Sequence, residues 1–110
     1  GKFHDAHSII VKDAIYKAEH IIIATGGEPM IPNMHGMHHV IDSDGFFALD
    51  KQPEKVAIIG SGYIGVELAG VLNGLGSETH LLMRGDKPLS RFDSVLGDTL
   101  LEIMHQQGIQ

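Results

Sequence analysis

The chain has 110 residues, a formal net charge of −6 and 43% hydrophobic residues, which is enough for one ordinary domain at most. The acidic balance argues against nucleic acid or an anionic membrane as a partner, and no apolar run approaches the roughly 18–20 residues of a membrane span. The absence of cysteine excludes a disulfide scaffold and thiolate chemistry within these residues. We therefore expect a soluble, cytoplasmic α/β chain.

Residues 1–27 have the pattern of short strands. Two alternating stretches, 8–12 and 14–17, flank a turn near Asp13 and predict a β-hairpin. The segment 20–24, with four consecutive apolar residues at 21–24, predicts a strand that is buried on both faces and ends at Gly26 and Gly27; the alternative is a buried helix segment.

Residues 28–53 show little periodicity and are long for a connection inside one compact unit. We interpret them as a crossing between two domains. A short helical segment at 43–49 is expected to attach this crossing to a surface through Phe46, Phe47 and Leu49.

Residues 54–110 follow a β-α-β-α pattern. Strands are predicted at 55–59 and 79–83, and helices at 64–75 and 94–107, the second capped by Asp93 or Ser94. Residues 109–110 resemble the start of a third strand. Because a mononucleotide-binding half needs βαβαβ, this is a partial Rossmann-type domain, and we expect the chain to be a segment of a longer protein.

A glycine-rich motif joins the first of these strands to its helix. It matches G-x-G-x-x-G and reads Gly60-Ser61-Gly62-Tyr63-Ile64-Gly65. Its glycines permit a tight turn, a close backbone approach to a pyrophosphate and close packing of helix on strand. We expect dinucleotide binding; the alternative is a tight turn that binds nothing.

The end of the second strand distinguishes NADPH from NADH. An NAD site favours a carboxylate there, but Met83 and Arg84 occupy the position, and a guanidinium suits a 2′-phosphate. Asp86 is the counter-argument, because it could pair with Arg84 or bind a ribose. We favour NADPH, and the alternative is a solvated arginine.

The stretches 23–27, 43–49 and 56–76 together resemble the pyridine nucleotide–disulfide oxidoreductases, and within them the bacterial glutathione reductases. The resemblance implies a homodimeric flavoprotein in which NADPH reduces FAD, FAD reduces a cysteine pair, and that pair reduces glutathione disulfide. It divides the chain into the tail of an FAD domain (1–27), an interdomain connection (28–53) and half of an NADPH domain (54–110).

The resemblance also implies roles for individual residues. A backbone contact to the adenine side of FAD is implied for Gly1, and a turn near the flavin cofactor for Thr25 and Gly26, so that all three are expected to belong to the FAD site. Contacts to NADPH are implied for Ser61 and Ile64, a cover over the nicotinamide pocket for Tyr63, and a position near the nicotinamide for Glu67. Arg84 matches the first of two arginines that hold the 2′-phosphate.

Three features depart from the family pattern. The second arginine position is Ser90, so Arg91 takes that role only if the loop shifts by one residue. Gly65 is often alanine in NADP-using relatives. The FAD glycine motif, the cysteine pair and a His-Glu pair are missing, so we expect this chain alone to be inactive. An NAD-linked relative similar to dihydrolipoamide dehydrogenase and a non-catalytic nucleotide-binding or assembly module are the alternatives.

The histidines give no reason to expect a metal site. Three of them cluster at His35, His38 and His39, without a helical i, i+4 pair or a carboxylate at ligand spacing.

Overall fold

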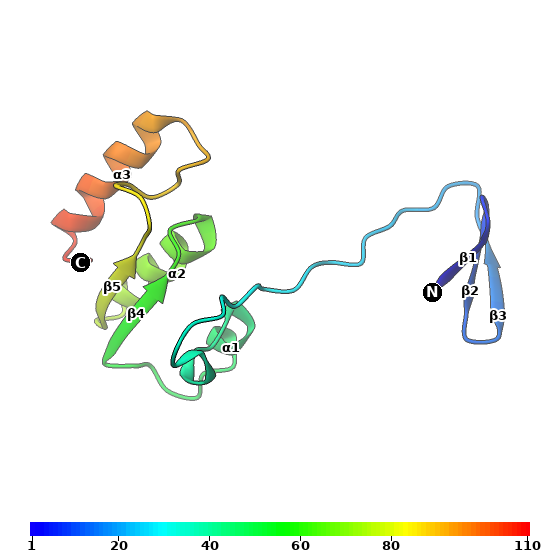
Figure 1. Cartoon of the computed structure of the whole chain (residues 1–110), viewed down its shortest axis with the longest axis horizontal. Helices are drawn as coiled ribbons and strands as arrows, with labels where there is room; N and C mark the ends of the chain where they lie inside the picture. Colours follow the sequence, from blue (N-terminus) through cyan, green and yellow to red (C-terminus); the bar gives the residue numbers. More distant parts are fainter. The chain divides into compact units, whose positions relative to one another are not determined.

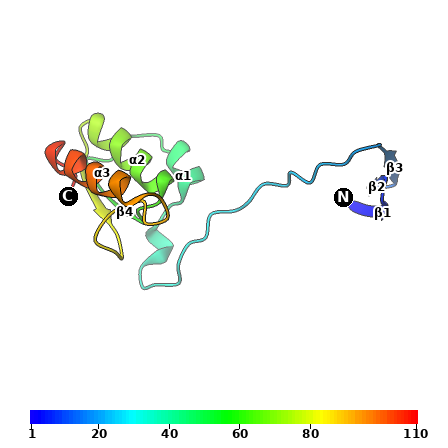
Figure 2. The same cartoon turned by 90° about the horizontal axis from the view of Figure 1, so that it is seen from above.

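A computed structural model describes all 110 residues, which form two compact units, Gly1–Met30 and Ile31–Gln110. Figures 1 and 2 show the elements of both units in two views. No helix has the length and apolar character needed to cross a membrane.

The first unit contains a three-stranded antiparallel sheet in the order β1-β2-β3. The predicted hairpin is confirmed: β2 (Ser8–Val11) pairs with β3 (Ala14–Lys17), and Lys12 in the turn has a φ of 55°. The third strand, β1 (Lys2–Asp5), was not predicted, because its sequence lacks the run of β-branched residues that marked its neighbours.

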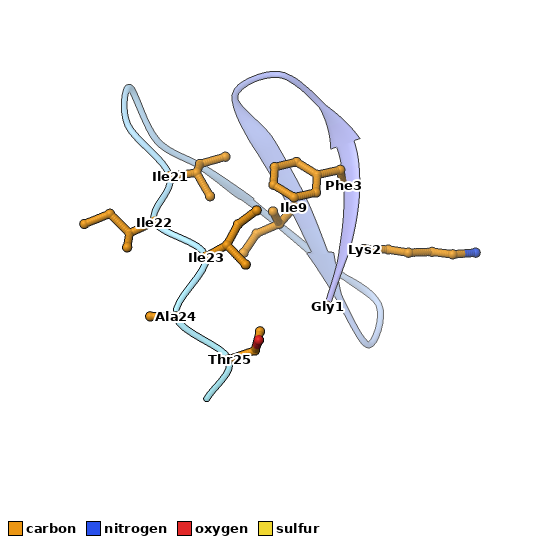
Figure 3. A pocket seen from close by; sticks show the side chains of 9 residues that line it. All are labelled: Gly1, Lys2, Phe3, Ile9, Ile21, Ile22, Ile23, Ala24 and Thr25. Atoms are coloured by element: carbon orange, nitrogen blue, oxygen red, sulfur yellow. The ribbon is translucent and has the colours of Figure 1, made fainter. Parts of the chain in front are cut away.

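The strand predicted at 20–24 is wrong. This segment belongs to neither sheet, and Ile22 and Ile23 are 88% and 72% exposed instead of buried on both faces. Figure 3 shows the alternation of an extended chain, with Ile21 and Ile23 directed toward the β-strands and Ile22 away from them. An apolar run becomes a strand only when another strand offers hydrogen-bonding partners, and none does so here.

The second unit begins with two short helices, a 3₁₀ turn (Met37–His39) and α1 (Ser43–Phe47). The helical segment expected here is confirmed, and Asp42 caps it by accepting a hydrogen bond from the Gly45 N–H at 2.9 Å. Its expected attachment is wrong for Phe47 and Leu49, which are 80% and 42% exposed. A helix this short turns only part of its surface toward neighbouring residues.

The remaining elements confirm the predicted β-α-β-α order. Each of them begins and ends within one or two residues of its predicted bounds. They are β4 (Lys55–Ile59), α2 (Tyr63–Gly74), β5 (Glu78–Leu82) and α3 (Ser94–Gln106), with β4 parallel to β5. Asp93 caps α3 by accepting from the Val95 N–H at 2.9 Å. Gln110 exchanges hydrogen bonds with β5, donating to Thr79 O and accepting from Leu81 N, so the chain ends as a third strand begins.

One face of the parallel strands holds the core of the second unit. The core residues are Ala69, Leu81, Met104 and Ile109, with Ile58, Val66 and Leu100 packed against them. Since Ile58 and Leu81 are register partners on one face, α2 and α3 cover the same side of the sheet. The opposite face is open, and Ile59 and Leu82 there are about half exposed.

A cluster of three charged or titratable side chains on that open face predicts that the stability of the fold decreases in acid. Lys55 Nζ and His80 Nε2 lie 2.6 Å and 3.0 Å from Glu78 Oε1, and hydrogen bonds from Lys55 and then His80 hold the pKa of the Glu78 carboxyl below its ordinary value of 4.5. A lowered pKa in the folded state stabilises the fold above the unfolded-state value, and this contribution is lost as the pH falls through the folded-state pKa.

We therefore expect the urea midpoint of the Glu78→Gln variant to change less than that of the unaltered chain between about pH 6 and about pH 3. Glu54→Gln, which replaces an exposed acid outside any ion pair, is the matched control and should keep the original acid sensitivity. Equal acid responses in the two variants would contradict this prediction.

Candidate functional site

The glycine-rich turn lies between the end of β4 and the start of α2. Gly60 has a φ of 113°, a conformation that favours glycine, and its N–H donates to Leu82 O of β5 at 2.9 Å. Gly62 is the N-cap of α2 without a side-chain cap, and the first helical hydrogen bond runs from Val66 N to Gly62 O. The N–H groups of the first helical turn are therefore available to an anion.

The other two motif glycines meet different surroundings. A Cβ added at Gly62 would meet no atom within 4 Å, so the backbone is open to a close ligand there. A Cβ added at Gly65 would lie 2.0 Å from Gly60 O, because the helix passes so close to the turn. The open space beside Gly62 and the close packing at Gly65 together fit a pyrophosphate group.

The other side chains of the turn are accessible. Tyr63 and Ile64, the first two residues of α2, are 61% and 44% exposed. Glu67 is exposed but is the fifth helical residue, beyond the first turn where a carboxylate gains most from the helix dipole. The helix dipole therefore gives Glu67 little stabilisation at this position.

The loop after β5 contacts the glycine turn. Within loop 83–93, the Leu89 N–H donates to Ser61 O at 2.8 Å. This link was not found from the sequence, since backbone hydrogen bonds between distant residues leave no pattern in it. Pro88 is fully buried, and a Cβ at Gly97 of α3 would lie 2.8 Å from Pro88 O. The loop is therefore in contact with both the glycine turn and α3.

The two loop arginines are exposed, and neither takes part in an ion pair. Arg84 follows Leu82, whose carbonyl accepts from Gly60, by two residues, so its backbone starts close to the glycine turn. The pairing of Asp86 with Arg84 that the sequence allowed does not occur. Arg91 lies in a turn in which the Phe92 N–H donates to Leu89 O at 2.8 Å.

The predicted FAD-contacting residues belong to the first unit. Gly1 and Thr25 line the same groove of about 330 Å³, together with Lys2, Phe3, Ile9 and residues 21–24. Figure 3 shows Lys2 directed away from the groove, which leaves an apolar lining. Gly26 has a φ of 75° and lies outside this lining. The groove is lined mainly by apolar side chains, and Thr25 is a polar residue among them.

The histidines of the 3₁₀ turn do not assemble with carboxylates. The centroids of the His38 and His39 rings lie 3.9 Å apart. No group of three or more His, Cys, Asp or Glu side chains could hold a metal ion.

A parallel β4-α2-β5 unit closed by a glycine turn is the architecture of dinucleotide-binding folds. The chain is similar to the solved structure of the HOCl-induced flavoprotein disulfide reductase RclA from Escherichia coli. It matches with a TM-score of 0.78 and 32% identity over 99% of this chain and 26% of that protein. The pyridine nucleotide-disulphide oxidoreductase model matches residues 1–110. The chain belongs to this family.

Curated relatives agree with this assignment. Glutathione reductase from Yarrowia lipolytica is 53% identical over 95 residues, which are 86% of this chain and 20% of the relative. The chloroplastic/mitochondrial glutathione reductase of Pisum sativum is 46% identical over 93 residues, or 84% of this chain and 17% of the relative. The chain thus spans about a fifth of the length of these relatives.

Proposed function

We propose that this chain is part of an NADPH-dependent flavoprotein that reduces glutathione disulfide, and that residues 60–65 with Arg84 bind the NADPH. The observation that carries the proposal is the contact between the loop bearing Arg84 and the glycine turn through Leu89 N and Ser61 O. One nucleotide could therefore meet both. The similarity to glutathione reductases supports the choice of disulfide substrate.

In this proposal the chain positions the nucleotide. The amides at the start of α2 hold the pyrophosphate, and Arg84, with Arg91 as a second cation, holds the 2′-phosphate. Tyr63 covers the nicotinamide pocket, and Glu67 lies near the nicotinamide. Gly1, Thr25 and Gly26 form part of the rim of an FAD site. When bound, NADPH supplies a hydride and the flavin accepts it.

The proposal assigns no thiol chemistry to this chain, because none of its residues is cysteine. We propose the same domain division as the sequence predicts: residues 1–27 as the end of an FAD domain, 28–53 as a connection and 54–110 as half of an NADPH domain. A cytoplasmic location and a homodimeric assembly of the whole protein stay predictions.

Calorimetric titration of the chain with NADPH and, separately, with NADH tests the proposal. We expect NADPH to bind at least about tenfold more tightly, since a charge-assisted contact to the 2′-phosphate is worth roughly 1.5–3 kcal/mol. Tighter binding of NADH would favour the NAD-linked alternative, similar to dihydrolipoamide dehydrogenase. Binding of neither nucleotide would contradict a nucleotide site in this chain.

A further inference from the structure

We propose that Gly97 and the Lys87–Asp98 ion pair are positioning residues for nucleotide choice. They would act by holding loop 83–93, which carries Arg84 and Arg91, against the glycine turn. This inference rests on the proposed function, because it concerns the loop assigned there to the 2′-phosphate. Figure 1 shows this loop running from the end of β5 to the start of α3.

The first attachment joins the loop to the glycine turn. Leu89 donates its N–H to Ser61 O at 2.8 Å and accepts at its own carbonyl from the Phe92 N–H at 2.8 Å. Leu89 has a φ of 55°, in the left-handed region that a branched side chain rarely adopts. A residue keeps such a conformation only where surrounding contacts hold it, which marks this point of the loop as constrained.

The second attachment joins the loop to the first turns of α3. Pro88 is fully buried, and a Cβ at Gly97 would lie 2.8 Å from its carbonyl oxygen and 3.1 Å from Lys87 Cδ. Only glycine allows α3 to approach the loop this closely. Next to it, Lys87 Nζ lies 2.9 Å from both carboxylate oxygens of Asp98. Residues 87–89 are therefore attached to the glycine turn and to α3.

This attachment matters for a ligand that bridges the two sites. The glycine turn would hold the pyrophosphate while the loop arginines hold the 2′-phosphate, so the spacing between turn and loop must match the nucleotide. A loop already held at that spacing loses less conformational entropy when NADPH binds. NADH lacks the 2′-phosphate, so its affinity should depend little on where the loop lies.

An Asp98→Ala variant separates positioning from simple electrostatics. Removing an acid and freeing Lys87 makes the loop more positive, which by charge alone would tighten NADPH binding. If the ion pair positions the loop, the ratio of NADPH to NADH affinity should instead fall about two- to fivefold. Glu102→Ala removes another exposed acid of α3 outside any ion pair and should not lower this ratio.

A Gly97→Ala variant tests the close approach of α3. We expect the affinity ratio to fall by about tenfold, because the new methyl group must push the loop carbonyl away. Hydrogen exchange at the Leu89 amide should also accelerate. Gly70→Ala in α2, where an added Cβ meets nothing within 4 Å, is the matched control and should change neither result.

The outcomes separate the two proposals. If the unaltered chain prefers NADPH but Asp98→Ala and Gly97→Ala keep the affinity ratio of their controls, the positioning role is overturned while the proposed function stands. If the unaltered chain shows no preference, the proposed function fails and the positioning role fails with it. If the Gly97→Ala variant does not fold, the Asp98→Ala variant alone tests the positioning role, because it changes an exposed residue.

Discussion

An Arg84→Glu variant is expected to bind NADPH about 100-fold more weakly, a loss of about 2.7 kcal/mol, while its affinity for NADH changes less than about threefold. Arg84 is exposed and in no ion pair, so its charge is free to meet a 2′-phosphate. A carboxylate at about 4 Å from that phosphate replaces attraction with a repulsion of roughly 1–4 kcal/mol. Calorimetric titration with both nucleotides measures the effect, which should shrink as salt is added.

Two further charge-reversal variants test whether the effect on NADPH affinity is specific to Arg84. Lys51→Glu alters an exposed lysine outside the loop by the same amount and should have little effect on either affinity. Arg91→Glu tests the second arginine, which follows the family position by one residue. A loss of NADPH affinity in Arg84→Glu no larger than in Lys51→Glu would contradict the assigned role of Arg84.

A Gly65→Ala variant is expected to lose about 2–3 kcal/mol of unfolding free energy and most of its nucleotide affinity. The added Cβ would lie 2.0 Å from Gly60 O and 3.1 Å from Gly60 C. Both are backbone atoms, so the turn must open before the residue fits. Urea unfolding measures the first effect and nucleotide titration the second. The variant also tests whether this turn can admit the alanine that NADP-using relatives often carry.

Gly70→Ala is the matched control for this substitution, since it lies in the same helix and an added Cβ there meets nothing within 4 Å. It should gain up to about 1 kcal/mol, because alanine is the better helix former. Similar changes in the urea midpoint for the two variants would show that the close approach of α2 to Gly60 is not required.

The second unit was predictable because its elements carry local patterns. The apolar positions of α2 repeat with the helical period, and the Asp93 cap marks the start of α3. The glycine motif is also local, since its residues are consecutive and their conformations follow from the strand-to-helix turn. These parts of the fold and of the site needed no knowledge of distant contacts.

The segment 20–24 shows where local patterns fail. Four apolar residues in a row predicted a buried strand, yet burial and pairing depend on other strands that lie beside it in space. The expected attachment of Phe47 to a surface is wrong for the same reason, because an aromatic side chain is buried only where another surface meets it. Neither result follows from the residues themselves.

By itself, the sequence determined the βαβα order, the glycine turn and the replacement of an acid by Met83 and Arg84 at the end of β5. Only the tertiary structure decided that loop 83–93 is attached to the glycine turn through Leu89 and to α3 through Gly97. The reason is physical: the helices and the glycine turn follow from neighbours along the chain, whereas these contacts join residues 28 and 9 positions apart that meet only when the chain folds.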